Sequence, residues 1–185
     1  MKVDLFWIIV LALLLAWTVW RLSALAGRID RVHHRIDLAR ASLDAQLLRR
    51  AAAAEAVAIS GLIDPSSGIV LAHAASNSRY VDPTDLVERG AIESEMSRDL
   101  REVFADAHEV AELRRNPEGN DLVEDLSAAC LQVELARRFL NDGVQAARLL
   151  RGGPLVRWFR LAGHAPQPLT FEMDDEIAPA LAGLL

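Results

Sequence analysis

The chain has 185 residues and a formal net charge of −6, which disfavours general nucleic-acid binding because such proteins are normally basic. Aromatic residues make up only 5% of the sequence, so a helical protein is favoured over a sheet protein. A single Cys excludes an internal disulfide.

The first predicted element is an apolar helix at the N-terminus. No charged residue occurs from Leu5 to Trp20, which spans roughly 24 Å as a helix. Residues 22–26 lengthen the apolar stretch toward the roughly 30 Å of a bilayer core. Trp7, Trp17 and Trp20 suit the membrane interfaces. We therefore predict a transmembrane anchor over residues 1–26.

A cleaved signal peptide is the alternative interpretation of this stretch. Lys2 would be its charged start, and Ala24-Leu25-Ala26 would be its cleavage site. The anchor is favoured because the apolar core is longer than a usual signal core and Arg21 separates it from that site. Cleavage would instead give an exported ligand-binding helical bundle.

The flanking charges predict the orientation of the anchor. Arg21, Arg28, Arg31 and Arg35 follow it, whereas only Lys2 and the amino terminus precede it. Basic residues stay on the cytoplasmic side. The prediction is a single-pass protein of the cell membrane, with the N-terminus outside and the following domain in the cytoplasm.

Three heptads from Arg28 to Leu48 follow the anchor. Ile29, Ile36 and Leu43 recur every seven residues, which gives one helix face that needs a partner helix. No Gly or Pro interrupts residues 28–60, so one long unbroken helix is predicted, ending near Gly61.

Three more helices are predicted. Asp64-Pro65 starts a short second helix, because Asp caps a helix and Pro suits its first position. A loop over residues 77–83 separates the second helix from the third, which is centred on residues 92–110. The fourth runs from about 121 to 150, after a break at residues 116–120. It carries one apolar stripe and a second beside it: Leu126, Val133, Leu140 and Ala147, then Leu131, Leu135 and Phe139.

The predicted fold class is therefore all-α. A transmembrane helix, residues 1–26, precedes an antiparallel four-helix bundle with long first and last helices, residues 27–161. An irregular C-terminal tail follows, residues 162–185, because it carries Pro166, Pro168 and Pro179.

Two stretches carry a family resemblance. One is Leu43–Arg50 on the first helix, and the other is Ala136–Val144 on the fourth. Together with the anchor, they resemble the LemA family of bacterial membrane proteins. The resemblance implies a single-pass protein with a four-helix bundle and no established enzymatic activity.

The polar residues of these two stretches are the candidate site. In one interpretation they fix the bundle register, with Gln46 and Arg50 pairing with Asp142 or Asn141. In the other they bind a partner or an anion, and the first is favoured. The set is Gln46, Arg49, Arg50, Arg137, Arg138, Asn141 and Asp142.

A second candidate surface lies at the end of the fourth helix. If the helices alternate up and down, this end returns toward the membrane. Its arginines would then contact anionic lipid while its aromatic side chains lie at the headgroup boundary. The alternative is that the aromatic residues close the end of the bundle core. The set is Arg148, Arg151, Arg157, Trp158, Phe159 and Arg160.

No metal site, cofactor or small-molecule substrate is predicted. His33 and His34 are adjacent on a helix and point apart, and His108 and Glu112 lack the other ligands of a zinc helix. Cys130 is expected to pack as a small hydrophobe.

An incomplete echo of the Nudix box gives an alternative function. Glu93, Glu102 and Asp106 match its acids, but Val87 and His108 stand where the motif needs Gly. The sequence thus favours a membrane-anchored interaction or scaffold protein without catalysis, bound to a protein partner or to itself. A Nudix-like pyrophosphohydrolase is the alternative.

Overall fold

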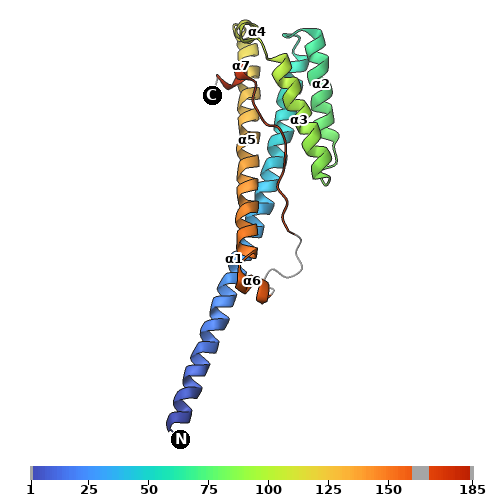
Figure 1. The fold of residues 1–185 in the computed structure, drawn as a ribbon. Coiled ribbons are helices and arrows are strands. Elements are labelled where there is room, and N and C mark those ends of the chain that lie inside the picture. The colour runs from blue at the N-terminus through green and yellow to red at the C-terminus, as the bar shows by residue number, and fades with distance from the viewer. Residues whose placement is uncertain (1, 160–166, 184–185) are drawn as a thin grey trace. The chain divides into compact units, whose positions relative to one another are not determined.

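The computed structural model describes residues 2–159 and 167–183, and these residues are mostly helical and include no strand (Figure 1). The helices are α1 (Lys2–Ile59), α2 (Pro65–Tyr80), α3 (Leu86–Val103), α4 (Ala107–Leu113), α5 (Pro117–Arg151), α6 (Pro154–Trp158) and α7 (Pro179–Ala182). They form two compact units. Unit 1 takes residues up to 38 and 142–169, and unit 2 takes 39–141 and those from 170 onward.

The predicted apolar N-terminal helix is confirmed. Within Phe6–Ile59, α1 contains an 18-residue stretch that is long and apolar enough to cross a membrane. None of that stretch is buried against the rest of the protein.

The remainder of unit 1 packs α1 against α5. The heptad residues Ile29 and Ile36 are buried on α1, and Val144 and Ala147 are buried on α5. A Cβ built on Gly143 would lie 3.5 Å from Ile36, so the two helices are in close contact there. The predicted heptad face is therefore a buried helix–helix face.

The helix starts in unit 2 follow from short polar caps. Gly61 has φ +71°, a conformation that glycine adopts readily, and lies two residues after the end of α1, where the chain turns into the connection. Asp64 accepts the backbone N–H groups of Ser66 and Ser67, with Pro65 at the first helical position, as predicted. The α2 helix extends to Tyr80, so the loop predicted from residue 77 begins later.

The predicted third helix is interrupted. It was expected to continue through Val110, but α3 ends at Val103 and α4 begins at Ala107. The Asp106 carboxylate accepts the His108 N–H at 2.7 Å, which caps a new helix. Similarly, α5 begins at Pro117 rather than near 121, because Asn116 accepts the Glu118 N–H at 3.0 Å.

The core of unit 2 confirms one predicted stripe on α5 and corrects the other. Leu126, Val133 and Leu140 are buried as predicted. In the second stripe, Leu131 and Leu135 are half-buried, but Phe139 is wrong because it is 70% exposed. The neighbouring positions that are buried instead are smaller: Ala129, Cys130 and Ala136.

The C-terminal segment joins the core of unit 2. Residues 167–178 have no regular secondary structure, as the prolines predicted. Nevertheless Phe171, Ala178 and Leu181 are buried, and Leu181 is 0% exposed. We call residues 170–182 the strap. In Figure 1 it is the dark red trace that runs beside α3 and α5.

Candidate functional site

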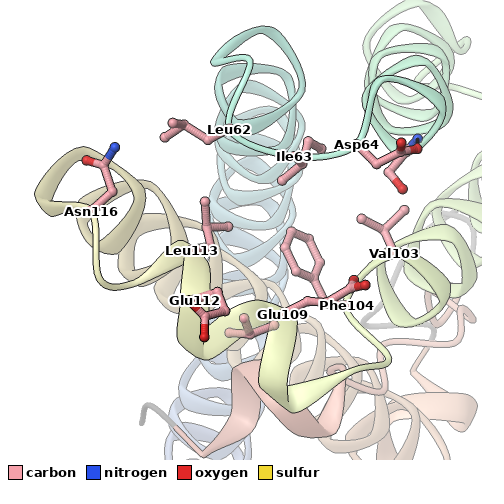
Figure 2. Close-up of a pocket in the computed structure, with 11 residues that line it drawn as sticks. Leu62, Ile63, Asp64, Val103, Phe104, Glu109, Glu112, Leu113 and Asn116 are labelled. Atoms are coloured by element: carbon pink, nitrogen blue, oxygen red, sulfur yellow. Dashed lines mark hydrogen bonds between the residues drawn. The ribbon is translucent and has the colours of Figure 1, made fainter.

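A pocket of about 390 Å³ lies in unit 2, where the α1–α2 connection meets the end of α3 and α4. This volume falls in the range of small-ligand sites. Figure 2 shows Ile63, Phe104 and Leu113 around the hollow, with Glu109 and Glu112 on α4. The lining is Leu62, Ile63, Asp64, Ser67, Val103, Phe104, Glu109, Val110, Glu112, Leu113 and Asn116.

The pocket combines an apolar lining with carboxylates. Phe104 and Val110 are buried, and Asp64, Glu109 and Glu112 contribute acidic groups. The Ser66 hydroxyl, followed by the Ser67 and Ser66 N–H groups, holds the pKa of Asp64 below its ordinary value, so this carboxylate stays ionised. The pocket therefore fits an apolar group that lies beside a positive charge.

This pocket was not predicted from the sequence. It is built from two connections and a short helix, and no periodic pattern links those segments. The available signals were the two capping residues, Asp64 and Asp106, and the apolar pair Leu62-Ile63 within a connection.

A charged network crosses the interior of unit 2. Arg50 on α1 is 2% exposed and Glu93 on α3 is 0% exposed, and their Nη2 and Oε2 atoms lie 2.7 Å apart. Arg50 also donates to Ser97 Oγ at 2.9 Å, and Ser78 Oγ on α2 donates to Glu93 at 2.7 Å. The network thus joins three helices through hydrogen-bonded charges.

This network corrects the predicted partner of Arg50. The expected partners were Asp142 or Asn141, but Arg50 pairs with Glu93, and Asn141 binds the backbone of Phe171. Gln46 also departs from the expectation, because its Oε1 is buried without a hydrogen-bond partner among the described residues. Arg49 is exposed, Asp142 is exposed in unit 1, and Arg138 pairs with Glu134 one turn away on α5.

The acids of the Nudix echo have separate roles in the structure. Glu93 is held by Arg50 and Ser78, and Asp106 caps α4. Across residues 2–159 and 167–183, no group of three or more His, Cys, Asp and Glu side chains is arranged to hold a metal ion.

The other motif residues hold the strap. Asn141 donates from Nδ2 to the Phe171 carbonyl at 3.1 Å and accepts the Phe171 N–H at 2.9 Å. Arg137 donates to both oxygens of Asp175, at 2.6 and 2.9 Å. Arg137 and Asn141 were predicted to fix the bundle register or to bind a partner, whereas in the structure both bind the strap. The strap was not predicted as their partner because it has no helical periodicity.

Arg101 on α3 also binds a strap aspartate with two hydrogen bonds, as Arg137 does. Arg101 donates to both oxygens of Asp174, at 3.1 and 2.5 Å, and to the Glu176 carbonyl at 2.9 Å. The hydrogen bond from Arg101 lowers the pKa of Asp174 from its ordinary 3.8. The ionised contact therefore stabilises the folded state above pH 3.8 and is lost as the pH falls through the lowered pKa.

The second candidate surface lies in unit 1. Arg148 donates to the Pro168 carbonyl at 3.2 and 3.1 Å, and Arg151 Nη1 lies 3.4 Å from His33 Nε2. Trp158 is 82% exposed, so it does not close a core, and its ring centroid lies 5.9 Å from that of Phe159. Arg157 is also exposed, and Arg160 lies outside the described residues.

Comparisons with known proteins provide no assignment. No protein-family model matches the chain, and no curated protein or solved structure matches it either.

Proposed function

We propose that the protein is a membrane-anchored helical interaction or scaffold protein without catalytic activity. One observation carries the proposal: α1 contains a stretch long enough to cross a bilayer, and none of it is buried within the protein. An apolar surface of this size needs a lipid or protein environment. The pocket and the strap contacts support a binding role for unit 2.

Within this proposal the chain adopts the organisation that the LemA resemblance implies. The parts of α1 and α5 in unit 2, together with α2 and α3, would form the antiparallel four-helix bundle, since all four contribute to its core. The exposed Trp158 would lie at the headgroup boundary, with Arg157 toward anionic lipid.

A ligand-binding role after export is a second candidate function, and the volume of the pocket favours it. It requires signal cleavage after Ala26, because only cleavage would remove the apolar stretch and release the rest of the chain from the membrane. Against it, α1 continues as helix through residues 24–27, where a signal protease needs extended chain.

Anchoring predicts resistance to extraction. The full-length chain is expected to remain with bacterial membranes after alkaline carbonate treatment, because its apolar stretch contacts lipid. Replacing the exposed Leu13 and Leu14 by Arg is expected to release it, because each charge near the bilayer centre costs about 2.5–3.5 kcal/mol. The exposed pair Leu48 and Ile59 outside that stretch provides the matched Arg variant, which should stay bound. Complete release of the wild-type chain would contradict the anchor.

The flanking arginines predict the orientation. Protease added outside spheroplasts is expected to leave unit 2 intact, because unit 2 lies in the cytoplasm, and to degrade it after lysis. N-terminal sequencing of the protected protein should find an N-terminus that precedes the apolar stretch. A mature N-terminus at Gly27 would instead support the exported ligand-binding protein.

A further inference from the structure

The pocket in unit 2 has an apolar interior and an acidic opening (Figure 2). Phe104 and Val110 are buried and Leu113 is half-buried, so these side chains form the apolar surface of the pocket. Asp64 and Glu109, in contrast, are exposed to solvent. A ligand with one apolar end and one polar end would therefore meet a matching surface at each end.

The charge of the pocket has a single sign. Three of the described residues that line it are acidic, Asp64, Glu109 and Glu112, and none of them is basic. The field of these carboxylates attracts a cation and repels an anion. The pocket therefore selects the polar end of its ligand by charge.

Glu112 already has basic partners within its own helix and the turn that follows. Its Oε2 accepts a hydrogen bond from Arg115 at 2.6 Å, and its Oε1 lies 3.8 Å from His108 Nε2. The Glu109 side chain, in contrast, forms no hydrogen bond or ion pair with the part of the chain that the structure describes. The charge of Glu109 is therefore available to a ligand.

Asp64 supplies a second acceptor oxygen. The hydrogen bonds that cap α2 come from the N–H groups of Ser66 and Ser67 and from the Ser66 hydroxyl, and all of them end on Asp64 Oδ2. Asp64 Oδ1 accepts none from the described residues. A primary ammonium group carries three N–H donors, so it suits a site in which more than one carboxylate offers an oxygen.

We propose that the pocket binds a small organic amine, in which a primary ammonium group is joined to an aromatic or branched aliphatic group. The apolar group lies against Phe104 and Leu113, and the ammonium group donates to Glu109 and Asp64. The volume of about 390 Å³ suits a small molecule of this kind. The inference rests on the binding role proposed for unit 2 and is independent of the membrane anchor.

Titration with phenethylamine tests the site. The full-length chain is prepared in an uncharged detergent with isotope-labelled Ile, Leu and Val methyl groups. We expect saturable shifts of the methyl NMR signals of Ile63, Val110 and Leu113, because these side chains line the pocket. The signals of Leu140, which is buried elsewhere in unit 2, should not move.

Three related probes separate the contributions of the two ends. Phenethyl alcohol keeps the ring without a charge, and its affinity should be roughly tenfold lower than that of phenethylamine. Ethylamine keeps the charge without the ring and should lose more than roughly tenfold, because it buries little apolar surface. The anion 3-phenylpropionate should bind more weakly than phenethyl alcohol, because the carboxylates repel it.

Glutamine variants identify the carboxylate that binds the amine. Glu109→Gln should weaken phenethylamine binding roughly fivefold, because it removes the charge and keeps the size of the side chain. Its affinity for phenethyl alcohol should not change, which also shows that the pocket still folds. Glu88→Gln is the matched control and should bind both probes as the wild type does. Glu88 and Glu109 are both exposed and both follow a capping aspartate by three residues, but Glu88 does not line the pocket.

Three results would overturn the proposal: no saturable shift at the pocket methyl groups, an affinity for 3-phenylpropionate equal to that for phenethylamine, or equal losses in Glu109→Gln and Glu88→Gln. Failure of the anchor gives a different result, because a chain released by carbonate would still bind phenethylamine in detergent. A chain that stays with the membrane but does not bind phenethylamine refutes the amine site and leaves the anchor standing.

Discussion

Replacing Glu93 by Leu is expected to lower the free energy of unfolding by about 3–5 kcal/mol, because it leaves the buried guanidinium group of Arg50 without its counter-ion. Ser78 would also lose its acceptor. Urea unfolding of the full-length chain in detergent, followed by circular dichroism, measures the change.

The double variant Arg50→Met with Glu93→Leu is the informative control. Removing both charges removes the desolvation penalty, so the double variant should recover most of the stability that the single variant loses. A Glu93→Leu protein as stable as the wild type would show that Arg50 is not buried with Glu93. If the double variant is no more stable than the single variant, the lost stability is due to altered packing and not to the unpaired charge.

Replacing Leu140 by Asp is expected to prevent folding of unit 2, because it buries an unpaired charge on α5. Leu140→Ala should cost roughly 2–5 kcal/mol through lost burial and the cavity left behind. The same denaturation experiment measures both variants.

Phe139→Asp is the matched control for this pair. Phe139 is adjacent on the same helix but largely exposed, so its substitution should change stability by only about 0.5 kcal/mol. If Phe139→Asp unfolded the protein and Leu140→Asp did not, the assignment of Leu140 to the buried face of α5 would be wrong.

Local sequence signals predicted the helices well. The heptad positions Ile29, Ile36 and Leu43 are buried, because the spacing of apolar residues reports one helix face directly. The cap at Asp64 was also predictable, because a cap involves only residues that are neighbours in the sequence. The short capped break before α4 was missed because apolar spacing continues across it.

Long-range partners were not predictable from spacing. Arg50 was recognised as a polar residue on the helix seam, but its partner Glu93 lies 43 residues further along the chain, beyond α2 and two connections. Several acids could satisfy one buried arginine, and only the packing of α3 against α1 decides among them. The strap was missed because a buried extended segment has neither helical nor strand periodicity.

The strap also constrains the order in which this protein can be made. The apolar part of α1 is synthesised first and can enter a membrane while the remainder of the chain is still on the ribosome. The core of unit 2, in contrast, requires Leu181. Until that residue has been translated, the surface beneath the strap stays open, and neighbouring nascent chains can compete for it. Under the proposed anchoring, membrane insertion is therefore expected to precede completion of the core of unit 2.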